Sequence, residues 1–479
     1  MKQLFTFCAL FFLGTNIFAN NINVTNVVYN SGAGTVTFNI SWENSWRTST
    51  APNNWDAAWV FIKRKNCNLN YWQHQDLSST SANHTAASPL EVQTTLDGKG
   101  VFIRRSGNGT GNIASTAVTL KLATVPGAIA EWDMQVFGVE MVYVPQGSFQ
   151  LGDGASVNSF RQGGGTSPTP AYTVASEAAI TFANTTGNLW ADVYSPTGGT
   201  ISAGYPKGFN ALYCMKYEIS QGQYADFLNT LSPDQSAARF ANSNGSARNT
   251  VSGVWPVFTS SAPNRACNYL TFADICAYND WSGLAPMSEM EFEKICRGPN
   301  AAVANEKAWG TSLVTDGSTV VNDALGNEGV SDVITAGSGV SNCTIVNGTP
   351  TGPVRCGFAA QAATTRLQAG ATFYGVMEMS GNVYEFVMGV SGAGTGFVGS
   401  AHGDGNLQFS PNEGLSDVTG WINQAVIANQ GAGAGATFKG GAYENAAGQL
   451  SVSDRTYSNN NFGGRTPATG GRGVRRSFN

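Results

Sequence analysis

The chain is poor in charged residues and in histidine. Only 12% of its 479 residues are Asp, Glu, Lys or Arg, and the formal net charge is -5. This composition argues against coiled coils and long exposed helices, and the lack of a basic patch argues against nucleic acid as a partner. The three histidines are scattered and no Cys-x-x-Cys pair occurs, so structural cysteines are favoured over a zinc site.

Long apolar runs are missing after the first twenty residues. Lys2 precedes an apolar run over residues 4–18, and Ile17-Phe18-Ala19 fits a small-residue cleavage site, which predicts a signal peptide over residues 1–19. The run is too short to span a bilayer comfortably, although an uncleaved signal anchor is the alternative. We therefore expect an exported mature chain without a transmembrane segment, in the periplasm or at the cell surface.

Export makes disulfides possible. Seven cysteines would remain after cleavage, and this odd number leaves at least one thiol without an intrachain partner. Cys343 and Cys356 flank a Gly/Pro turn segment and are predicted as the best intrachain pair. Cys267, Cys276 and Cys296 fall in or beside predicted helices, where they could pair or simply be buried.

Glycine, in contrast, is abundant, with 58 copies, which is typical of short strands joined by tight turns. Over residues 20–136, apolar and polar positions alternate in short segments, most clearly in Val36-Phe38-Ile40-Trp42. This pattern predicts an all-β sandwich as the first domain. Five tryptophans concentrated there are expected to fill its core, with a sugar-stacking platform as the alternative: Trp42, Trp46, Trp55, Trp59 and Trp72.

A second domain is predicted over residues 137–479. Residues 154–211 are rich in Gly, Ser, Thr and Pro, which indicates an elaborated surface loop. Three helices are then indicated by capping boxes, in which a side-chain oxygen and a residue three positions later satisfy the first amides. Short strands around a few helices predict an α+β domain. The boxes are Ser220-x-x-Gln223, Thr271-x-x-Asp274 and Ser288-x-x-Glu291.

Six segments of this second domain resemble, in order, motifs of the formylglycine-generating-enzyme (sulfatase-modifying-factor) family. Gly381-Asn382-Val383-Tyr384-Glu385-Phe386, for example, resembles the family's G-N-V-W-E-W. The resemblance implies a C-type-lectin-like fold that follows the all-β sandwich. The matching segments are residues 141–149, 215–227, 286–298, 375–386, 439–443 and 473–475.

The resemblance also implies a structural calcium site. The matching ligands are the side chains of Glu378 and Glu385 and the carbonyls of Gly381 and Val383. Two carboxylates and two backbone oxygens in one tight loop suit a hard cation. The alternative is that both carboxylates hydrogen-bond loop amides.

Family enzymes oxidise a substrate cysteine to formylglycine with oxygen, and they bind copper(I) through two active-site cysteines. Here the matching positions are Ala447 and Val452, and no cysteine follows Cys356. Cuprous copper requires soft thiolates, so no copper is expected. With three scattered histidines, the three-histidine iron site of other branches of the superfamily is not expected either.

We therefore predict a secreted, non-catalytic scaffold at the bacterial cell envelope or surface. A formylglycine-generating oxidase with an atypical active site is the alternative. The expected partner is an envelope or cell-surface protein or a glycan, and inactive family members of Bacteroidota-like bacteria favour a part in secretion, adhesion or gliding. Clustered aromatic, amide and basic side chains predict the ligand-binding surface: Tyr443, Asn445, Arg455, Tyr457, Asn460 and Arg472.

Overall fold

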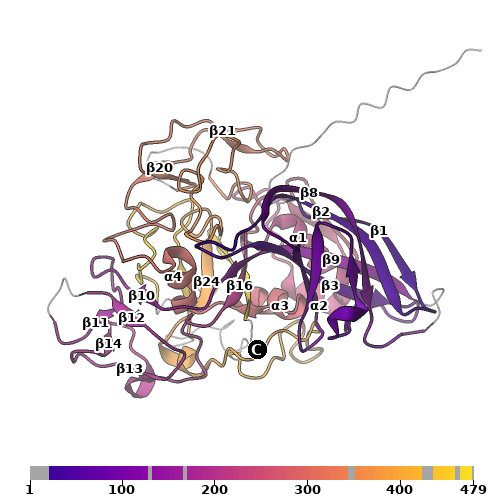
Figure 1. The fold of residues 1–479 in the computed structure, drawn as a ribbon, viewed down its shortest axis with the longest axis horizontal. Coiled ribbons are helices and arrows are strands. Elements are labelled where there is room, and N and C mark those ends of the chain that lie inside the picture. Colours follow the sequence, from indigo (N-terminus) through magenta and orange to yellow (C-terminus); the bar gives the residue numbers. More distant parts are fainter. Residues whose placement is uncertain are drawn as a thin grey trace, which may run out of the picture.

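Short strands dominate the fold, and its few helices have at most ten residues. In Figure 1 the N-terminal strands form the broad sheets on the right, while loops with short strands fill the left and the top. The molecule is therefore mostly β. The computed structural model describes residues 21–127, 132–165, 170–343, 351–422, 435–458 and 464–476.

A four-stranded antiparallel sheet in the order β1-β2-β8-β5 forms the outer N-terminal layer. Along β2, burial alternates with every second residue, and Val36, Phe38, Ile40 and Trp42 are all buried. The strand predicted from this apolar pattern is confirmed. The members of the sheet are β1 (Asn23–Asn30), β2 (Thr35–Arg47), β8 (Gly109–Lys121) and β5 (Thr85–Ala86).

An eight-stranded sheet runs from the N-terminal part into the rest of the chain, in the order β19-β27-β16-β9-β3-β7-β6, with β4 paired to β3. Its central strand β9 pairs with β3 on one side and with β16 on the other. The strands are β3 (Asp56–Lys65), β4 (Gln73–Gln75), β6 (Leu90–Thr94), β7 (Val101–Arg105), β9 (Asp133–Val144), β16 (Leu212–Met215), β19 (Ala285–Pro286) and β27 (Gly473–Arg476).

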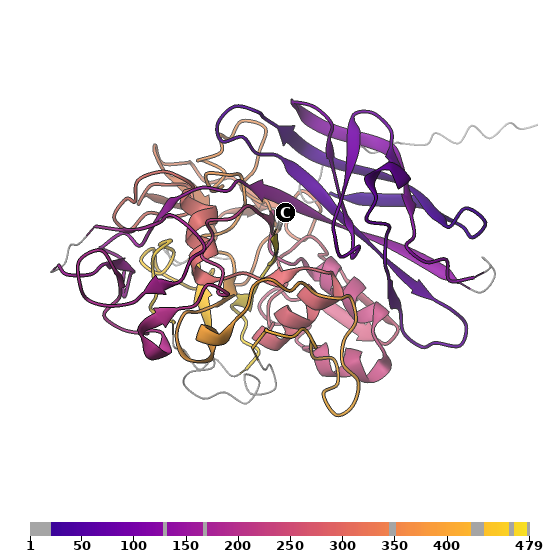
Figure 2. The ribbon, with the colours of Figure 1, turned by 60° about the horizontal axis from the view of Figure 1, so that its bottom comes forward.

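The predicted boundary between residues 136 and 137 falls inside β9, so the two parts share a hydrogen-bonded sheet and no linker separates them. Strand β3 is buried on both faces. Ala58, Val60 and Ile62 belong to the core shared with the four-stranded sheet. Trp59 and Phe61 belong to the larger core that also contains the helices. Figure 2 shows the N-terminal strands above the helices in this arrangement.

The three predicted helices are confirmed, each with a complete capping box. A fourth helix was not predicted, although Ser232 and Gln235 form the same kind of box and proline stands at its first position. The helices are α1 (Gln221–Thr230), α2 (Pro233–Arg239), α3 (Phe272–Trp281) and α4 (Glu289–Arg297).

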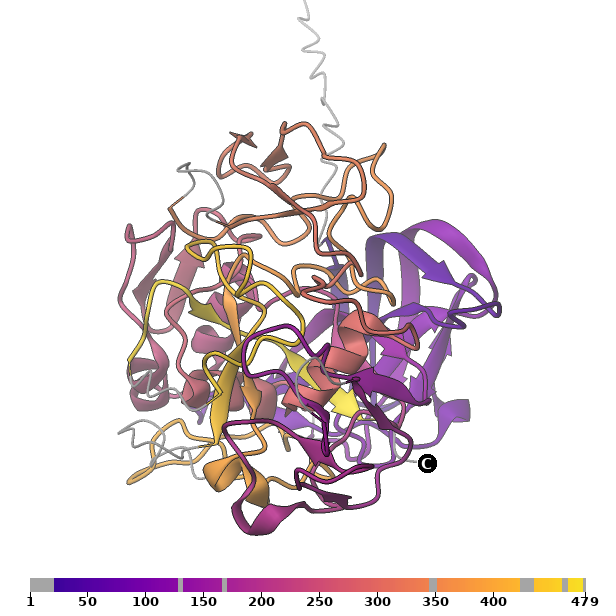
Figure 3. The same cartoon turned by 90° about the vertical axis from the view of Figure 1, so that its left-hand side faces the viewer.

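The predicted loop over residues 154–211 carries the short strands β11 to β15. They pair as β11–β14 and β13–β15, and β12 pairs with β10, which precedes the loop. Figure 3 shows this region and the C-terminal loops face on. The remaining strands are β10 (Phe149–Leu151), β11 (Arg161–Gln162), β12 (Tyr172–Val174), β13 (Ile180–Thr181), β14 (Leu189–Trp190), β15 (Thr200–Ile201), β17 (Val251–Val254), β18 (Val257–Ser260), β20 (Val314–Asp316), β21 (Val320–Val321), β22 (Gly329–Val330), β23 (Gly339–Ser341), β24 (Tyr384–Met388), β25 (Ala436–Lys439) and β26 (Thr469–Gly470).

The predicted disulfide between Cys343 and Cys356 is wrong. Cys356 is a free, fully buried thiol, and its Sγ lies 3.6 Å from the carbonyl oxygen of Glu218. The pairing was inferred from a turn between the two cysteines, whereas the partner of Cys356 lies 138 positions away in the sequence. Cys267, Cys276 and Cys296 are likewise buried free thiols.

None of the helices in the described part of the chain is long and apolar enough to cross a membrane. The predicted signal peptide, residues 1–19, lies outside the described residues.

The N-terminal cap of α3 can be tested by mutation. The hydroxyl oxygen of Thr271 accepts from the backbone N–H of Asp274 at 3.1 Å and donates to the Asp274 carboxylate at 2.8 Å. We expect Thr271→Ala to lower the free energy of unfolding by about 1 kcal/mol, because the first turn loses its cap. Thr271→Ser should keep most of it. Urea unfolding measures both, and an unchanged Thr271→Ala midpoint contradicts the capping role.

Candidate functional site

The loop predicted to bind calcium leads into β24 and is closed by a buried ion pair. Both carboxylate oxygens of Glu385 accept from the Arg472 guanidinium, at 2.7 and 2.8 Å. Arg472 also donates to the carbonyl oxygen of Met377 at 2.8 Å and to that of Met215 at 3.1 Å. One fully buried guanidinium therefore ties this loop to β16 and to the C-terminal segment.

Two further buried carboxyl groups lie in the same region. Oε1 of Glu378 accepts from the backbone N–H of Gly357 at 2.9 Å, and its Oε2 is buried without a hydrogen-bond partner. Burial raises the pKa of Glu378 to about 7. Glu218 accepts from the backbone N–H of Val383 at 3.1 Å and from the Asn382 side chain, and burial raises its pKa well above the usual range.

The predicted ligand set does not fit a calcium ion in this arrangement. Arg472 occupies both oxygens of Glu385, while Glu378 hydrogen-bonds a loop amide, as the alternative interpretation had it. Sequence reasoning overlooked Glu218, which shares the buried region with these two carboxyl groups and stands inside one of the matched motifs. Arg472 and Arg355 both lie near Glu378 and lower its pKa, but the loss of hydration on burial outweighs them. Calcium binding here stays a prediction.

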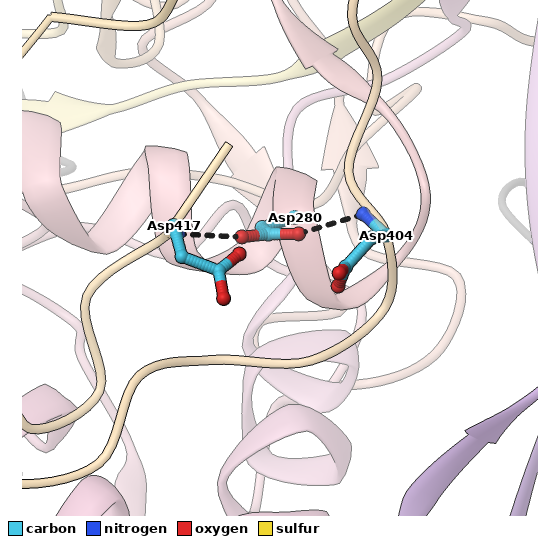
Figure 4. A group of neighbouring side chains, drawn as sticks. All are labelled: Asp280, Asp404 and Asp417. Atoms are coloured by element: carbon cyan, nitrogen blue, oxygen red, sulfur yellow. Dashed lines mark hydrogen bonds between the residues drawn. The ribbon is translucent and has the colours of Figure 1, made fainter. Parts of the chain in front are cut away.

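A different group of carboxylates comes together at the end of α3. Oxygens of Asp280, Asp404 and Asp417 lie within 4.8 Å of one another, and Asp280 is buried while the other two are exposed. Figure 4 shows the Asp280 carboxylate accepting from the backbone N–H groups of Asp404, at 2.9 Å, and Asp417, at 3.3 Å. Burial raises the pKa of Asp280 to about 7. In the structure, Asp280 therefore anchors the loop over residues 403–417 to α3.

A buried lysine, Lys63, lies beside this trio. Lys63 is fully buried, and its Nζ donates to the carbonyl oxygens of Trp281, at 2.7 Å, and Gly405, at 2.5 Å. Burial lowers the pKa of Lys63, and the negative charges of Asp280 and Asp404 oppose that effect. The trio thus resembles a hard-cation site in composition, and Lys63 lies near enough for the charges of Asp280 and Asp404 to affect its pKa.

Two arginines of the predicted ligand-binding surface are not on the surface, so this part of the prediction is wrong. Arg455 is fully buried, donates from Nε to Glu289 at 2.8 Å, and lies 3.8 Å from the ring centroid of Phe160. Arg472 is buried against Glu385. Arginine carries five donors, so in this loop-rich domain it satisfies buried acceptors instead of facing a ligand.

The remaining residues of that set are mostly turned inward as well. Tyr443 and Asn445 are each 8% exposed, and Oδ1 of Asn445 accepts from the backbone N–H of Ala442 at 2.8 Å, as in a tight turn. Tyr457 is half-buried, and its hydroxyl accepts from Gln449 at 2.9 Å. Asn460 lies outside the described residues.

The positions matched to the family's reactive cysteines carry no thiol. Val452 is fully buried in a cluster with Phe292 and Trp309, and its backbone N–H donates to the carbonyl oxygen of Glu306 at 2.9 Å. Ala447 is half-buried in the turn before it. At the position expected for a reactive cysteine, the structure therefore has a buried aliphatic side chain.

Comparison with known proteins decides the family. The model of the sulfatase-modifying factor enzyme 1-like domain matches residues 131–477. The chain belongs to this family. The match includes β9 and extends past β27, so the sulfatase-modifying factor domain includes the strand that pairs with the N-terminal part. No curated protein matches the chain.

Similar solved structures are distant. "Treponema denticola variable protein 1" has 11% identity and a TM-score of 0.32, and the match covers 71% of this chain and 96% of that one. "Major Tropism Determinant I1 Variant" has 14% identity and a TM-score of 0.25, with 82% and 83% covered. At such scores neither similarity supports a functional conclusion.

The raised pKa of Glu378 predicts a pH-dependent stability. Its stabilising contribution is fully present below pH values near 4.5 and is lost as the pH rises through about 7, because the buried side chain resists ionisation. At about pH 8, we expect the free energy of unfolding of Glu378→Gln to exceed that of the wild type by about 1–3 kcal/mol. At about pH 5, the two free energies should differ little. Urea unfolding at both pH values measures this. Glu444→Gln, at an exposed position, is the matched control, and a Glu378→Gln protein that is less stable at both pH values contradicts the prediction.

The same proteins test the calcium prediction. If calcium binds at Glu378, calcium chloride should raise the melting temperature of the wild type above its value in EDTA, and Glu378→Gln should lose this increase. A wild-type melting temperature that is equal in calcium and EDTA rules out the predicted site.

Proposed function

We propose that this chain is a secreted, non-catalytic member of its family that acts as a binding or structural scaffold at the bacterial cell envelope or surface. Its partner is an envelope or cell-surface protein or a glycan. In this proposal the family domain has a C-type-lectin-like fold, and the N-terminal strands form a sandwich that is built onto it through β9.

The single observation that carries the proposal is the position of Val452. A residue in the place of a copper-binding cysteine is fully buried among aliphatic and aromatic side chains. Cuprous copper needs thiolate ligands, which valine cannot supply. Arg455, which matches the arginine of the family motif, forms a buried ion pair with Glu289 and is therefore part of the framework.

The other cysteines do not offer a substitute centre. Six of those in the described residues are buried, and burial raises the pKa of Cys214 to about 12 and that of Cys296 and Cys356 well above the usual range. Thiols held in the protonated form are poor ligands and poor nucleophiles. Cys67 is exposed, but it lies in the N-terminal part, before the family domain.

The alternative is a formylglycine-generating oxidase with an atypical active site, which family membership alone favours. It requires a redox centre other than the two matched positions. The buried thiols leave Cys67 as the accessible one among the described residues, and a single thiol does not reproduce a pair.

The proposal is tested by incubating the purified chain with copper(I), oxygen and a Cys-x-Pro-x-Arg peptide. We expect the peptide to keep its thiol, as followed by mass spectrometry, because no thiolate pair can bind the copper. A catalytically active family enzyme under the same conditions is the positive control. Oxygen-dependent conversion of the peptide cysteine by this chain would overturn the non-catalytic assignment.

A further inference from the structure

A cavity of about 1250 Å³ lies where the N-terminal strands meet the family domain. One wall comes from the segment 43–54 at the end of β2 and after it, together with Asn112 of β8. The other wall comes from residues 216–217 and from the segment 355–377. Small-molecule pockets usually measure about 300–1,000 Å³, so this cavity has room for a ligand of several linked units.

Two tyrosines present unsatisfied hydroxyl groups to this cavity. Tyr217 is 6% exposed and Tyr374 is 5% exposed, and both line it. Neither hydroxyl forms a hydrogen bond with any residue that the structure describes, and burial accounts for the raised pKa of each. Hydroxyl groups that line a cavity and have no described protein partner can donate to, and accept from, a polar ligand that enters it.

Aromatic faces accompany these hydroxyls. Trp46 and Phe373 line the cavity and are half-exposed. The Trp46 indole N–H donates to Oδ1 of Asn54 at 3.2 Å, and the Asn54 side-chain N–H donates to the carbonyl oxygen of Tyr374 at 2.7 Å. These two bonds fix the indole ring across the junction before a ligand enters. The Lys216 ammonium lies 5.3 Å from the ring centroid, so a ligand would contact the part of the ring that remains accessible.

The lining combines apolar and polar side chains, and its charged members are Glu43, Lys216, Arg355 and Arg366. The ammonium group of Lys216 is paired with Glu140 at 3.0 Å, and both side chains are buried. The guanidinium of Arg366 donates to the carbonyl oxygens of Ala371 and Thr372, each at 2.9 Å. Most of the other polar side chains are uncharged amides and hydroxyls, among them Asn44, Asn112, Asn322, Asn327, Gln361 and Thr364.

We propose that this cavity binds a neutral oligosaccharide. A sugar chain offers hydroxyls for the two tyrosines and the amides, and apolar ring faces for Trp46 and Phe373, in the same molecule. Lys216 is paired with Glu140, and the guanidinium groups of Arg355 and Arg366 donate to backbone carbonyl oxygens, so a neutral sugar can bind without breaking an ion pair. This inference rests on the proposed scaffold function and names the ligand class and its site.

The test uses the full mature chain and a panel of neutral hexasaccharides: maltohexaose, cellohexaose, xylohexaose, mannohexaose and chitohexaose. Isothermal titration calorimetry should detect binding of at least one of them. Tyr217→Phe and Tyr374→Phe remove only a hydroxyl that has no described protein partner, so each should keep its melting temperature while binding weakens about 3- to 10-fold. Tyr172→Phe on β12, outside the cavity, is the matched control and should bind like the wild type.

Two results would overturn the proposal. One is that no hexasaccharide binds at millimolar concentration; the other is that binding is unchanged in both cavity variants, which places the sugar elsewhere. Selective binding of a cell-surface peptide in this cavity, with no sugar bound, counts as the first result. Peptide oxidation in the copper assay would refute the non-catalytic function, but it would leave the sugar titrations interpretable, so the two failures are distinguishable.

Discussion

The pairing of β9 with both β3 and β16 is the constraint on which the rest of the structure depends. It joins the N-terminal strands and the family domain into one hydrogen-bonded sheet, so the two parts cannot rotate apart without breaking backbone hydrogen bonds. Trp46 and Tyr217, from opposite sides of this junction, therefore face the same cavity. A flexible linker between two separate domains would not hold such a cavity open in one shape.

Buried ion pairs hold segments of the chain together where it has little regular secondary structure. Long loops leave many carbonyl oxygens without a ladder or helix partner, and these must be satisfied from elsewhere. Arg472 bonds Glu385 and the carbonyls of Met215 and Met377, and Arg297 bonds Glu293 and the carbonyl of Gln150. These buried arginines of the family domain therefore stabilise its framework. This explains why Arg455 and Arg472 were misassigned to a surface.

Local features could be predicted from the sequence, while features that depend on distant partners could not. The boxes at Ser220, Thr271 and Ser288 lie within four residues and were identified correctly. Arg472 lies 87 positions from Glu385, and no local pattern announces that pair. The cavity is equally non-local, since its walls come from segments more than 300 positions apart. Only the five concentrated tryptophans hinted at it, and of these Trp42 and Trp59 fill the cores as expected, whereas Trp46 remains half-exposed in the cavity.

Under the proposed non-catalytic function, the stability of the fold would not depend on a redox centre. A buried valine at this place contributes hydrophobic contacts to the core. Val452 belongs to the same buried cluster as Phe292 and Trp309, and Arg455 is paired with Glu289, so both residues are part of the framework of the domain. In the proposed function, the ligand binds at a different place in the molecule. The junction with the N-terminal strands offers a cavity that the family domain does not form alone, because residues 43–54 supply part of its wall.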